Sequence, residues 1–347
     1  MMLKEQQLAQ EVRLELPAGI SAAFTLHGQE FALDSATCHV IKDAGDDPDI
    51  TNRAEVHVTV TRTRNPSAAN SGIIISGGTG IGRATKPGLA VAPGEYAINP
   101  VPRRMIEEAV QEVLHQAPDS GPPLTINVVV SIPDGEQRAL KTLNSRLGII
   151  GGLSILGTTG IVKPVSAKAW TDTIDAALDV AAAGNCETVV CCTGRTSELS
   201  AQRYLDDKSS TGSLPEEAYV MMGDHVAHTL RSSLARGFKQ PVVACQFAKL
   251  VKIACGHENT HAAASEMDLQ QLLRWAEKAQ LPEALLQTIR GANTAREIVI
   301  ATGFDDTLLR MTAAQALLAA QQHAPGITPL FLVADYSDNI IFDSSST

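Results

Sequence analysis

Residues 76–88, SGGTGIGRATKPG, follow the apolar run GIII and have the glycine content of a phosphate-binding loop. A Walker loop requires GxxxxGK followed by Ser or Thr, but Arg83 replaces that lysine and Ala84 replaces the hydroxyl residue. The dinucleotide pattern GxGxxG also fails, because Arg83 stands where its third glycine belongs. Both motifs lead directly into a helix, which the prolines and glycines of TKPGLAVAPGEY exclude. The loop therefore favours a tight turn or a close approach of backbone to a flat ligand.

A second glycine-rich stretch, residues 133–164, carries an unusual local charge. From Arg138 to Lys163 it contains four basic residues and no acidic one, in a chain whose formal net charge is −10. Such a cluster suits a ligand with several carboxylates or phosphates. The alternative is a buried glycine-rich crossover with solvated basic side chains.

An acidic segment, KDAGDDPDIT at residues 42–51, is a third candidate. The spacing of a calcium loop is absent, and turns rich in aspartate explain most such runs. A carboxylate here, Asp43 or Asp46, could instead accept a proton or bind a ribose hydroxyl.

A fourth candidate is KLVKIACGHENTHAAASEMD, residues 249–268. His257 and His261 are spaced for zinc on a helix, but GHENT predicts a loop and no third ligand is evident, so no metal is expected. Lys249 and Lys252 beside two histidines favour an anionic ligand. We expect the following helix to be capped near Thr260 or Ser265.

The composition limits the class of partner. Aromatic residues are only 4% of the 347-residue chain and the charge is negative, which disfavours nucleic acids and anionic membranes. No signal-peptide core is evident, and the longest uncharged stretch, residues 147–162, is too short and too glycine-rich to span a membrane. Six cysteines without a CxxC pair indicate a reduced, cytoplasmic protein.

The periodicity predicts two domains, 1–163 and 164–347. In the first, an α+β domain, strands are expected at 12–16, 22–26, 56–61, 72–76 and 125–131, with a helix from 99–102 to Gln116. In the second, alternating helices and strands predict a three-layer α/β domain with a parallel sheet and a C-terminal hairpin. Residues 295–301 are interpreted as a helix, because Asn293 and Thr294 supply a cap. Clefts between the two domains and the carboxyl ends of the second domain's strands are the expected ligand sites.

Taken together, these blocks resemble one family. KDAGDDPDIT, GGTGIGRATKPGL with AINPVPRRMI, NSRLGIIGGLSILGTTGIVKP, TGRTSE and KLVKIACGHENTH have the order and spacing of the cobalt-precorrin-5B C1-methyltransferases of anaerobic cobalamin biosynthesis. The resemblance covers nearly the whole chain. It implies S-adenosylmethionine-dependent methylation of C-1 of a cobalt-containing tetrapyrrole, giving cobalt-precorrin-6A. It also implies a fold unlike that of the other corrin methyltransferases, with cobalt present only in the substrate.

For this reaction no covalent nucleophile is required, and we expect Asp43, Asp46 or His261 to accept a proton or orient the ring. The acidic macrocycle needs cationic side chains, and its flat ring needs bare backbone. Self-association into a homo-oligomer stays open. The residues expected to bind substrate or cofactor are Gly77, Gly78, Thr79, Gly80, Gly82, Arg83, Lys86, Arg138, Lys141, Asn144, Arg146, Thr158, Thr159, Gly160, Lys249 and Lys252.

The sequence departs from the family pattern in two places. Members of the family normally open with a Gly/Thr-rich, cysteine-containing segment ahead of the strand at 12–16, and Phe247-Ala248 stand where a glycine is usual. The first departure raises an alternative function, a non-catalytic tetrapyrrole-binding protein. A nucleotide-dependent reductase is a third interpretation, disfavoured by the failed dinucleotide motif.

Overall fold

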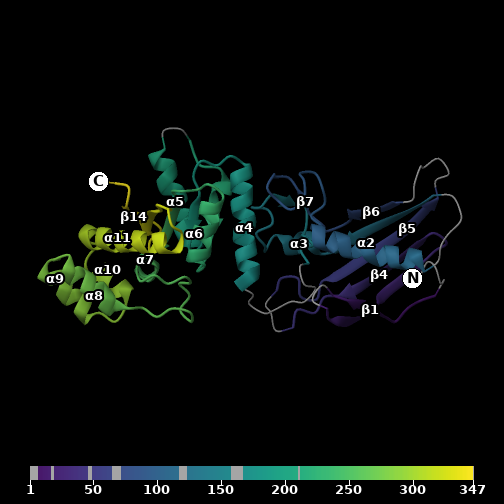
Figure 1. The fold of residues 1–347 in the computed structure, drawn as a ribbon, viewed down its shortest axis with the longest axis horizontal. Helices are drawn as coiled ribbons and strands as arrows, with labels where there is room; N and C mark the ends of the chain where they lie inside the picture. Colours follow the sequence, from purple (N-terminus) through teal and green to yellow (C-terminus); the bar gives the residue numbers. More distant parts are fainter. Residues whose placement is uncertain are drawn as a thin grey trace. The chain divides into compact units, whose positions relative to one another are not determined.

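The computed structural model describes residues 7–16, 19–45, 49–64, 72–116, 123–157, 167–209 and 212–346. The chain divides into two compact units, 1–166 and 167–347 (Figure 1). The domain boundary expected between residues 163 and 164 lies outside the described residues.

Unit 1 contains a five-stranded sheet with the order β3-β4-β5-β8-β6. Strands β6 and β8 are parallel and are joined through helix α2, while the other neighbours are antiparallel. Two smaller pairs, β1-β2 and β7-β9, are also antiparallel. The elements are β1 (Glu11–Glu15), β2 (Ser21–Thr25), β3 (His27–Phe31), β4 (Ser35–Ile41), β5 (Glu55–Arg64), β6 (Gly72–Gly77), β7 (Arg83–Ala84), α2 (Pro100–His115), β8 (Leu124–Ser131), α3 (Gly135–Ala139) and β9 (Ile149–Ile150).

Helix α2 covers one face of this sheet. Pro100 occupies its first turn, where the missing N–H costs no hydrogen bond. Its apolar stripe of Ile106, Val110 and Leu114 packs on the buried side chains of β8, which alternate along the strand as the burial pattern of β8 shows. The apolar stripe of α2 and the buried side chains of β8 together form the core of unit 1.

The opposite face of the sheet is polar along β4 and β5. Thr37 and Thr59 face each other with their hydroxyl oxygens 2.9 Å apart. His39 and His57 are the next pair on the same face, because side chains two residues apart on a strand share a face.

The predicted elements of unit 1 are confirmed, but four strands and one short helix were missed. Each of the five predicted strands and the helix to Gln116 agrees with an observed element to within about three residues. The missed elements are β3, β4, the two-residue strands β7 and β9, and the five-residue helix α3. The sequences of β3 and β4, HGQEF and SATCHVI, lack a clean alternation of apolar and polar residues, because one face of the sheet is only partly covered.

Unit 2 is a three-layer α/β structure, as predicted. Its sheet has the order β11-β10-β12-β13-β14, parallel except for β14. Helix α5 packs on one face, while α4, α6, α7 and α11 pack on the other. The elements are α4 (Ala167–Ala183), β10 (Val190–Cys192), α5 (Arg195–Lys208), η1 (Glu216–Ala218), β11 (Tyr219–Met221), α6 (Val226–Ala235), β12 (Val242–Gln246), α7 (Phe247–Ala254), α8 (Leu269–Lys278), α9 (Glu283–Gly291), α10 (Ala295–Ala301), α11 (Asp306–His323), β13 (Leu330–Ala334) and β14 (Ile340–Asp343).

Side-chain caps mark the starts of α8 and α10 in unit 2. Residues 295–301 are helical as predicted, with the Thr294 hydroxyl accepting from the amide of Glu297. The prediction of a cap near Thr260 or Ser265 was wrong: α8 begins at Leu269 and the Asp268 carboxylate accepts from the amide of Gln271. Both hydroxyl residues are instead buried in a loop.

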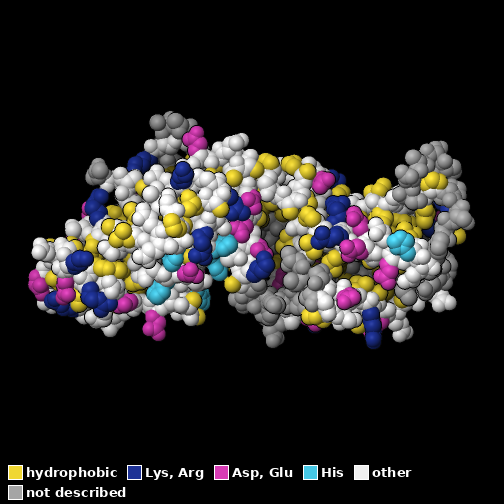
Figure 2. Space-filling model, viewed as in Figure 1, with side chains coloured by type: hydrophobic (Ala, Val, Ile, Leu, Met, Phe, Trp, Pro, Cys, Tyr) yellow, Lys and Arg dark blue, Asp and Glu magenta, His cyan; other side chains and the backbone are white. Residues whose placement is uncertain are grey.

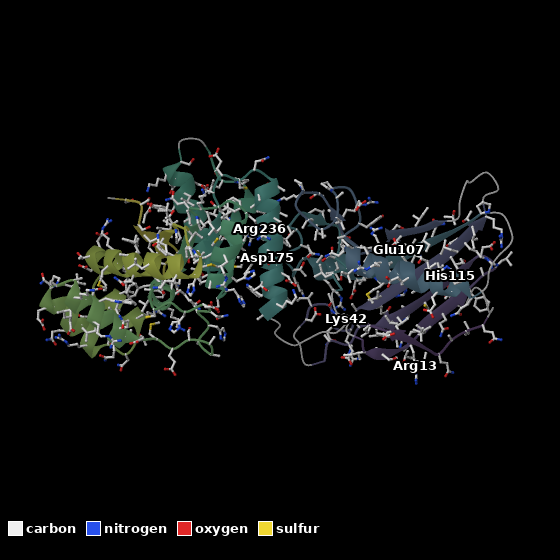
Figure 3. The ribbon with its side chains drawn as sticks, viewed as in Figure 1. Arg13, Lys42, Glu107, His115, Asp175 and Arg236 are labelled. Carbon is white, nitrogen blue, oxygen red and sulfur yellow. The ribbon has the colours of Figure 1, made fainter. Side chains whose placement is uncertain are left out.

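Charged pairs tie neighbouring helices of unit 2. Arg236, just after α6, donates two hydrogen bonds to Asp179 of α4, at 2.6 and 3.0 Å, and a longer one to Asp175. Figure 3 labels Arg236 and Asp175 on these neighbouring elements. On the face drawn in Figure 2, basic and acidic side chains are interspersed. Among the described residues, no helix has both the length and the apolar character needed to cross a bilayer.

The end of β14 supplies a pH-sensitive contribution to stability. The Asp343 side chain is 9% exposed and accepts from Lys208 at 2.7 Å and from the Tyr204 hydroxyl at 2.9 Å. Burial alone would raise its pKa, but the hydrogen bonds from Lys208, Ser345 and Tyr204 outweigh burial and lower it to about 2. Because the folded-state pKa is depressed, this stabilisation is complete above about pH 4 and disappears as the pH falls towards 2.

We therefore expect Asp343→Asn to lower the free energy of unfolding of unit 2 at pH 7 by about 2 kcal/mol, with the difference from the wild type vanishing near pH 2. Both tryptophans of the chain, Trp170 and Trp275, lie in unit 2, so tryptophan fluorescence during urea unfolding measures it. Asp306→Asn is the matched control, because Asp306 is an exposed i,i+4 partner of Arg310. A pH-independent difference at Asp343 would contradict the prediction.

Candidate functional site

One edge of the unit 1 sheet gathers most of the residues predicted to form a site. Strands β4, β6 and β8 all end there and β5 begins there, because Ile41 pairs with Glu55, His57 with Ser131, and Gly77 with Val130. The acidic loop 42–54, the glycine loop 78–82 and the segment 132–140 therefore leave the sheet at the same edge. The strands position these three loops.

At this edge the two glycine-rich blocks pack backbone against backbone. The amide of Leu153 donates to the carbonyl oxygen of Gly80, and the amide of Gly82 donates to that of Leu153, both at 2.9 Å. The close approach leaves no room for side chains: a Cβ on Gly82 would lie 2.9 Å from the Gly152 carbonyl oxygen, and one on Gly152 would lie 2.8 Å from the Gly82 nitrogen. Several glycines of the opening motif are thus required by contact within the protein.

The outer part of the blocks is more open. Gly151 has a positive φ of 84°, and a Cβ added to it would meet nothing within 4 Å, while Thr79 and Arg83 are exposed. Both interpretations of the glycine motif therefore have support: buried glycines close the turn, and exposed backbone lies beside them. Ligand binding by Gly77, Gly78, Thr79, Gly80 and Gly82 stays a prediction.

The basic side chains of this edge divide into anchored and outward-lying ones. Arg138 is anchored: it donates to Asp134 at 2.8 Å and to the Asn52 carbonyl oxygen at 2.9 Å, tying the acidic loop to α3. Arg83 is exposed but also anchored: its guanidinium donates to the Gly94 carbonyl oxygen at 2.8 Å and lies over the Tyr96 ring, 3.9 Å from its centre. Lys141 is exposed.

Hydrogen bonds at residues 85 and 86 hold the second block against the first, and a bond from Asn144 orders the second block itself. The Lys86 ammonium donates to the Arg146 carbonyl oxygen at 3.3 Å, and the Asn144 amide donates to the Gly152 carbonyl oxygen at 3.2 Å. The first contact joins Lys86 of the first block to Arg146 of the second, and the other lies within the second block.

The acidic loop is ordered by its own hydrogen bonds. Lys42, labelled in Figure 3, bonds to the side chains of Asp49 and Thr51. Asp43 is exposed, and its carboxylate accepts from the amide of Gly45 at 2.9 Å, as in an Asx turn. Asp46, Thr158, Thr159 and Gly160, which were also predicted, lie outside the described residues.

Unit 2 has a second candidate site at the carboxyl ends of its parallel strands. The chain passes from β10 to β11 on one side of β10 and then to β12 on the other, which makes a topological switch point between β10 and β12. Ligands of open α/β sheets bind at such points. Here Thr193 and Gly194 follow β10, and α5 starts at Arg195, so its free amides lie at this edge.

A partly buried network holds the loop 257–265 at the same edge. Asp224 accepts from the Thr260 hydroxyl at 2.7 Å and pairs with Lys249. Lys252 is 8% exposed and donates to the carbonyl oxygens of Thr260 and Ser265, at 3.1 and 2.8 Å. Lys249 and Lys252, predicted to bind an anion, thus have protein partners here, and they fix the backbone beside exposed His261.

The pKa shifts reflect this environment. Burial lowers the pKa of Lys252 and of His225. Burial would raise the pKa of Asp224, but hydrogen bonds from Lys249 and Thr260 outweigh it and lower that pKa. Burial raises the pKa of Cys191 and Cys245 to about 12, so neither thiol is available as a nucleophile.

Sequence reasoning missed three features of the structure. The first is an ion pair, 2.8 Å long, between Arg195 and Glu198, whose side chain is 1% exposed. Both residues lie in the block TGRTSE. Its Gly-Arg-Thr-Ser sequence, directly after an apolar strand, is typical of a helix start at a switch point. The Trp170 indole donates to the Met222 carbonyl oxygen beside Gly223. A row of histidines crosses β3, β4 and β5. No pattern along the sequence reveals the last two, because they depend on which strands are neighbours.

The comparisons with known proteins agree along the chain. Residues 1–164 match the family model described as CbiD, and residues 259–345 match the one described as CbiD, C-terminal domain. The cobalt-precorrin-5B C(1)-methyltransferase of Pelobacter propionicus is 61% identical over 99% of this chain and 91% of that protein. The protein of the same name from Geobacter sulfurreducens is 52% identical over 98% of this chain and 92% of that protein.

A crystal structure of the cobalamin biosynthesis protein CbiD from Archaeoglobus fulgidus is 24% identical and covers 71% of each chain, with a TM-score of 0.34. The identities to the two curated relatives and the match of the family model to the first 164 residues place the chain in a family. The resemblance found in the sequence blocks is confirmed. The chain belongs to the CbiD family, the methyltransferases of cobalamin biosynthesis.

Proposed function

We propose that this protein transfers a methyl group from S-adenosylmethionine to C-1 of cobalt-precorrin-5B and gives cobalt-precorrin-6A. The observation that carries the proposal is the relationship, along nearly the whole chain, to proteins that bear the name of this activity. The edge of the unit 1 sheet supports it, because it combines exposed backbone at Gly151 with the cationic side chains of Arg83, Lys86 and Lys141. Cobalt enters only as part of the substrate.

Methyl transfer depends more on the alignment of the methyl donor with the acceptor carbon than on reactive side chains of the protein. A ring carbon attacks the methyl group in line with the bond to sulfur; the new C–C bond forms as the C–S bond breaks, and S-adenosylhomocysteine leaves without the positive charge of the sulfonium. The protein gains most by holding donor and acceptor in line and by excluding water. The buried thiols of Cys191 and Cys245 fit this picture, since no covalent intermediate is needed.

We assign the macrocycle's carboxylates to the basic side chains of the unit 1 edge, and an orienting or proton-accepting role to Asp43, Asp46 or His261. We place the reaction in the cytoplasm, which suits six cysteines that are all free thiols. Self-association remains a prediction.

Calorimetric titration of the full chain with S-adenosylmethionine, and separately with NADPH, tests the cofactor. Binding of the sulfonium alone supports the proposal, whereas binding of NADPH alone favours a reductase. Incubation with cobalt-precorrin-5B and S-adenosylmethionine, followed by mass spectrometry, tests the reaction. If the tetrapyrrole binds but gains no methyl group, the protein is a non-catalytic tetrapyrrole-binding protein and not an enzyme.

Reversing the charge of Arg146 separates the two ligands. We expect Arg146→Glu to weaken tetrapyrrole binding by roughly 10-fold or more and to leave S-adenosylmethionine binding within about twofold, because only the macrocycle carries several carboxylates. Arg104→Glu, at an exposed position on α2, is the matched control for net charge. Equal changes for both ligands, or an equal loss in the control, would refute the assignment of Arg146.

A further inference from the structure

Three histidines lie in a row across three neighbouring strands of unit 1. His27 of β3 pairs in register with His39 of β4, and His39 pairs with His57 of β5. The rings stack in sequence, with centres 5.6 Å apart for the first pair and 4.4 Å apart for the second. The row lies on the face of the sheet that α2 does not cover, since Val56 and Val58 on either side of His57 pack into the core.

A carboxylate completes the cluster. Glu55 is two residues before His57 on β5, so both side chains lie on the same face, and its oxygen is 3.0 Å from the His57 Nε2. One ligand atom each from His39, Glu55 and His57 can be chosen such that all lie within 4.8 Å of one another. Two donor atoms bound to one tetrahedral zinc are about 3.3 Å apart, so side-chain rotations alone could close the cluster around an ion.

The backbone around His39 is shaped for this ring. Strand β3 has a register shift between His27 and Glu30, and Gly28 within it has a positive φ of 52°. A Cβ on Gly28 would lie 2.6 Å from two atoms of the His39 imidazole, so only glycine fits. Within the part of the chain that the structure describes, the buried Nδ1 of His39 has no hydrogen-bond partner. A buried polar nitrogen without a partner costs free energy unless something binds it.

We propose that His39, Glu55 and His57 form a binding site for a divalent first-row transition metal, with Zn²⁺ as the best match. Two imidazoles and one carboxylate are a recognised zinc ligand set, and three protein ligands leave the fourth position to water or to another group. His27 is the next side chain in the row and is near enough to orient His39. An ion bound to both side chains takes the place of the contact between the Glu55 carboxylate and the His57 Nε2. This site is independent of the methyl-transfer proposal and of the cobalt in the substrate.

Titration of the chelator-treated full chain with Co²⁺ and with Zn²⁺ tests the site. We expect one equivalent of Co²⁺ to bind with visible d–d absorption and without a thiolate-to-cobalt charge-transfer band, because the ligands are nitrogen and oxygen. Zn²⁺ should displace the Co²⁺ and raise the thermal unfolding midpoint. Binding by the free cysteines instead would produce the charge-transfer band and would overturn the assignment.

Three variants locate the ion. His57→Ala, His39→Ala and Glu55→Gln are each expected to weaken Zn²⁺ binding at least 10-fold, and circular dichroism checks that each still folds. His115→Ala is the matched control, since His115 is exposed at the end of α2 in the same unit (Figure 3). Unchanged affinity in Glu55→Gln and His57→Ala, a loss in His115→Ala, or no binding to the wild type would each refute the site.

Discussion

Replacing Gly80 with alanine is expected to destabilise unit 1 by roughly 4 kcal/mol or more. Two costs combine at this position. Gly80 has a φ of 72°, where a side chain is strained, and an added Cβ would lie 2.9 Å from the Gly135 nitrogen and closer still to the Ile132 carbonyl oxygen. These are backbone atoms at the centre of the packed glycine blocks, so no side-chain rotation can relieve the collision.

Gly151→Ala separates the two costs. Gly151 has a similar φ of 84°, but a Cβ there meets nothing within 4 Å, so only the strain of about 1–2 kcal/mol is expected. Urea unfolding followed by circular dichroism reports on both units, and tryptophan fluorescence reports on unit 2. Gly80→Ala should lower the midpoint seen by circular dichroism far more than Gly151→Ala does, with little change in fluorescence. Equal midpoints for the two variants would contradict the prediction, because they would show that the backbone around Gly80 accommodates an added Cβ without extra cost.

The same glycines show what the sequence could and could not tell. Arg83, Ala84 and the following prolines were enough to exclude a nucleotide loop, because those motifs depend on local spacing. That Gly80 and Gly152 touch could not be inferred, since they are 72 positions apart in the sequence. The contact depends on β6, β8 and the β7-β9 pair bringing the two blocks to one edge.

The fold was predicted correctly where the hydrophobic pattern of the sequence matches the side chains that are buried in the core. Strand β8 is an apolar run with NVVV at its centre and α2 has an apolar stripe, and both were predicted. Strands β3 and β4 were missed because their exposed face carries histidine, threonine and glutamine, which leaves no simple period. The histidine row went unnoticed for the same reason, since its members meet only once these strands are paired.

In unit 2 the predicted residues lie together, but their surroundings differ from expectation. Lys252 was expected to bind an anion, yet it is buried and donates to two backbone carbonyl oxygens. Sequence spacing placed it correctly beside the histidines, but it could not show that the loop 257–265 folds back over α7. The consequence is a rigid backbone around His261, whose own side chain is exposed.

That rigidity leads to the prediction with the largest effect on activity. The His261 Nδ1 accepts from the amide of Ala263 at 3.2 Å, so in the neutral ring Nε2 carries the proton and can donate a hydrogen bond. Of the roles proposed for His261, this geometry favours orienting the substrate over accepting a proton. Loss of one preorganised donor typically lowers turnover by about 10²- to 10³-fold. We therefore expect His261→Ala to reduce kcat by roughly that factor, with an unfolding midpoint close to that of the wild type.

The neighbouring histidine makes the test specific. His257→Ala alters the same loop and is expected to keep kcat within about threefold, since no side-chain hydrogen bond ties His257 to the network of Asp224 and Thr260 among the contacts of the described residues. His261→Gln retains an N–H donor and should recover part of the lost turnover. Full turnover in His261→Ala would remove the residue from the mechanism, and an equal loss in His257→Ala would attribute the effect to the loop. Recovery by Gln that restores kcat without changing KM would identify His261 as a donor used in the transition state, because an interaction made only there changes kcat alone.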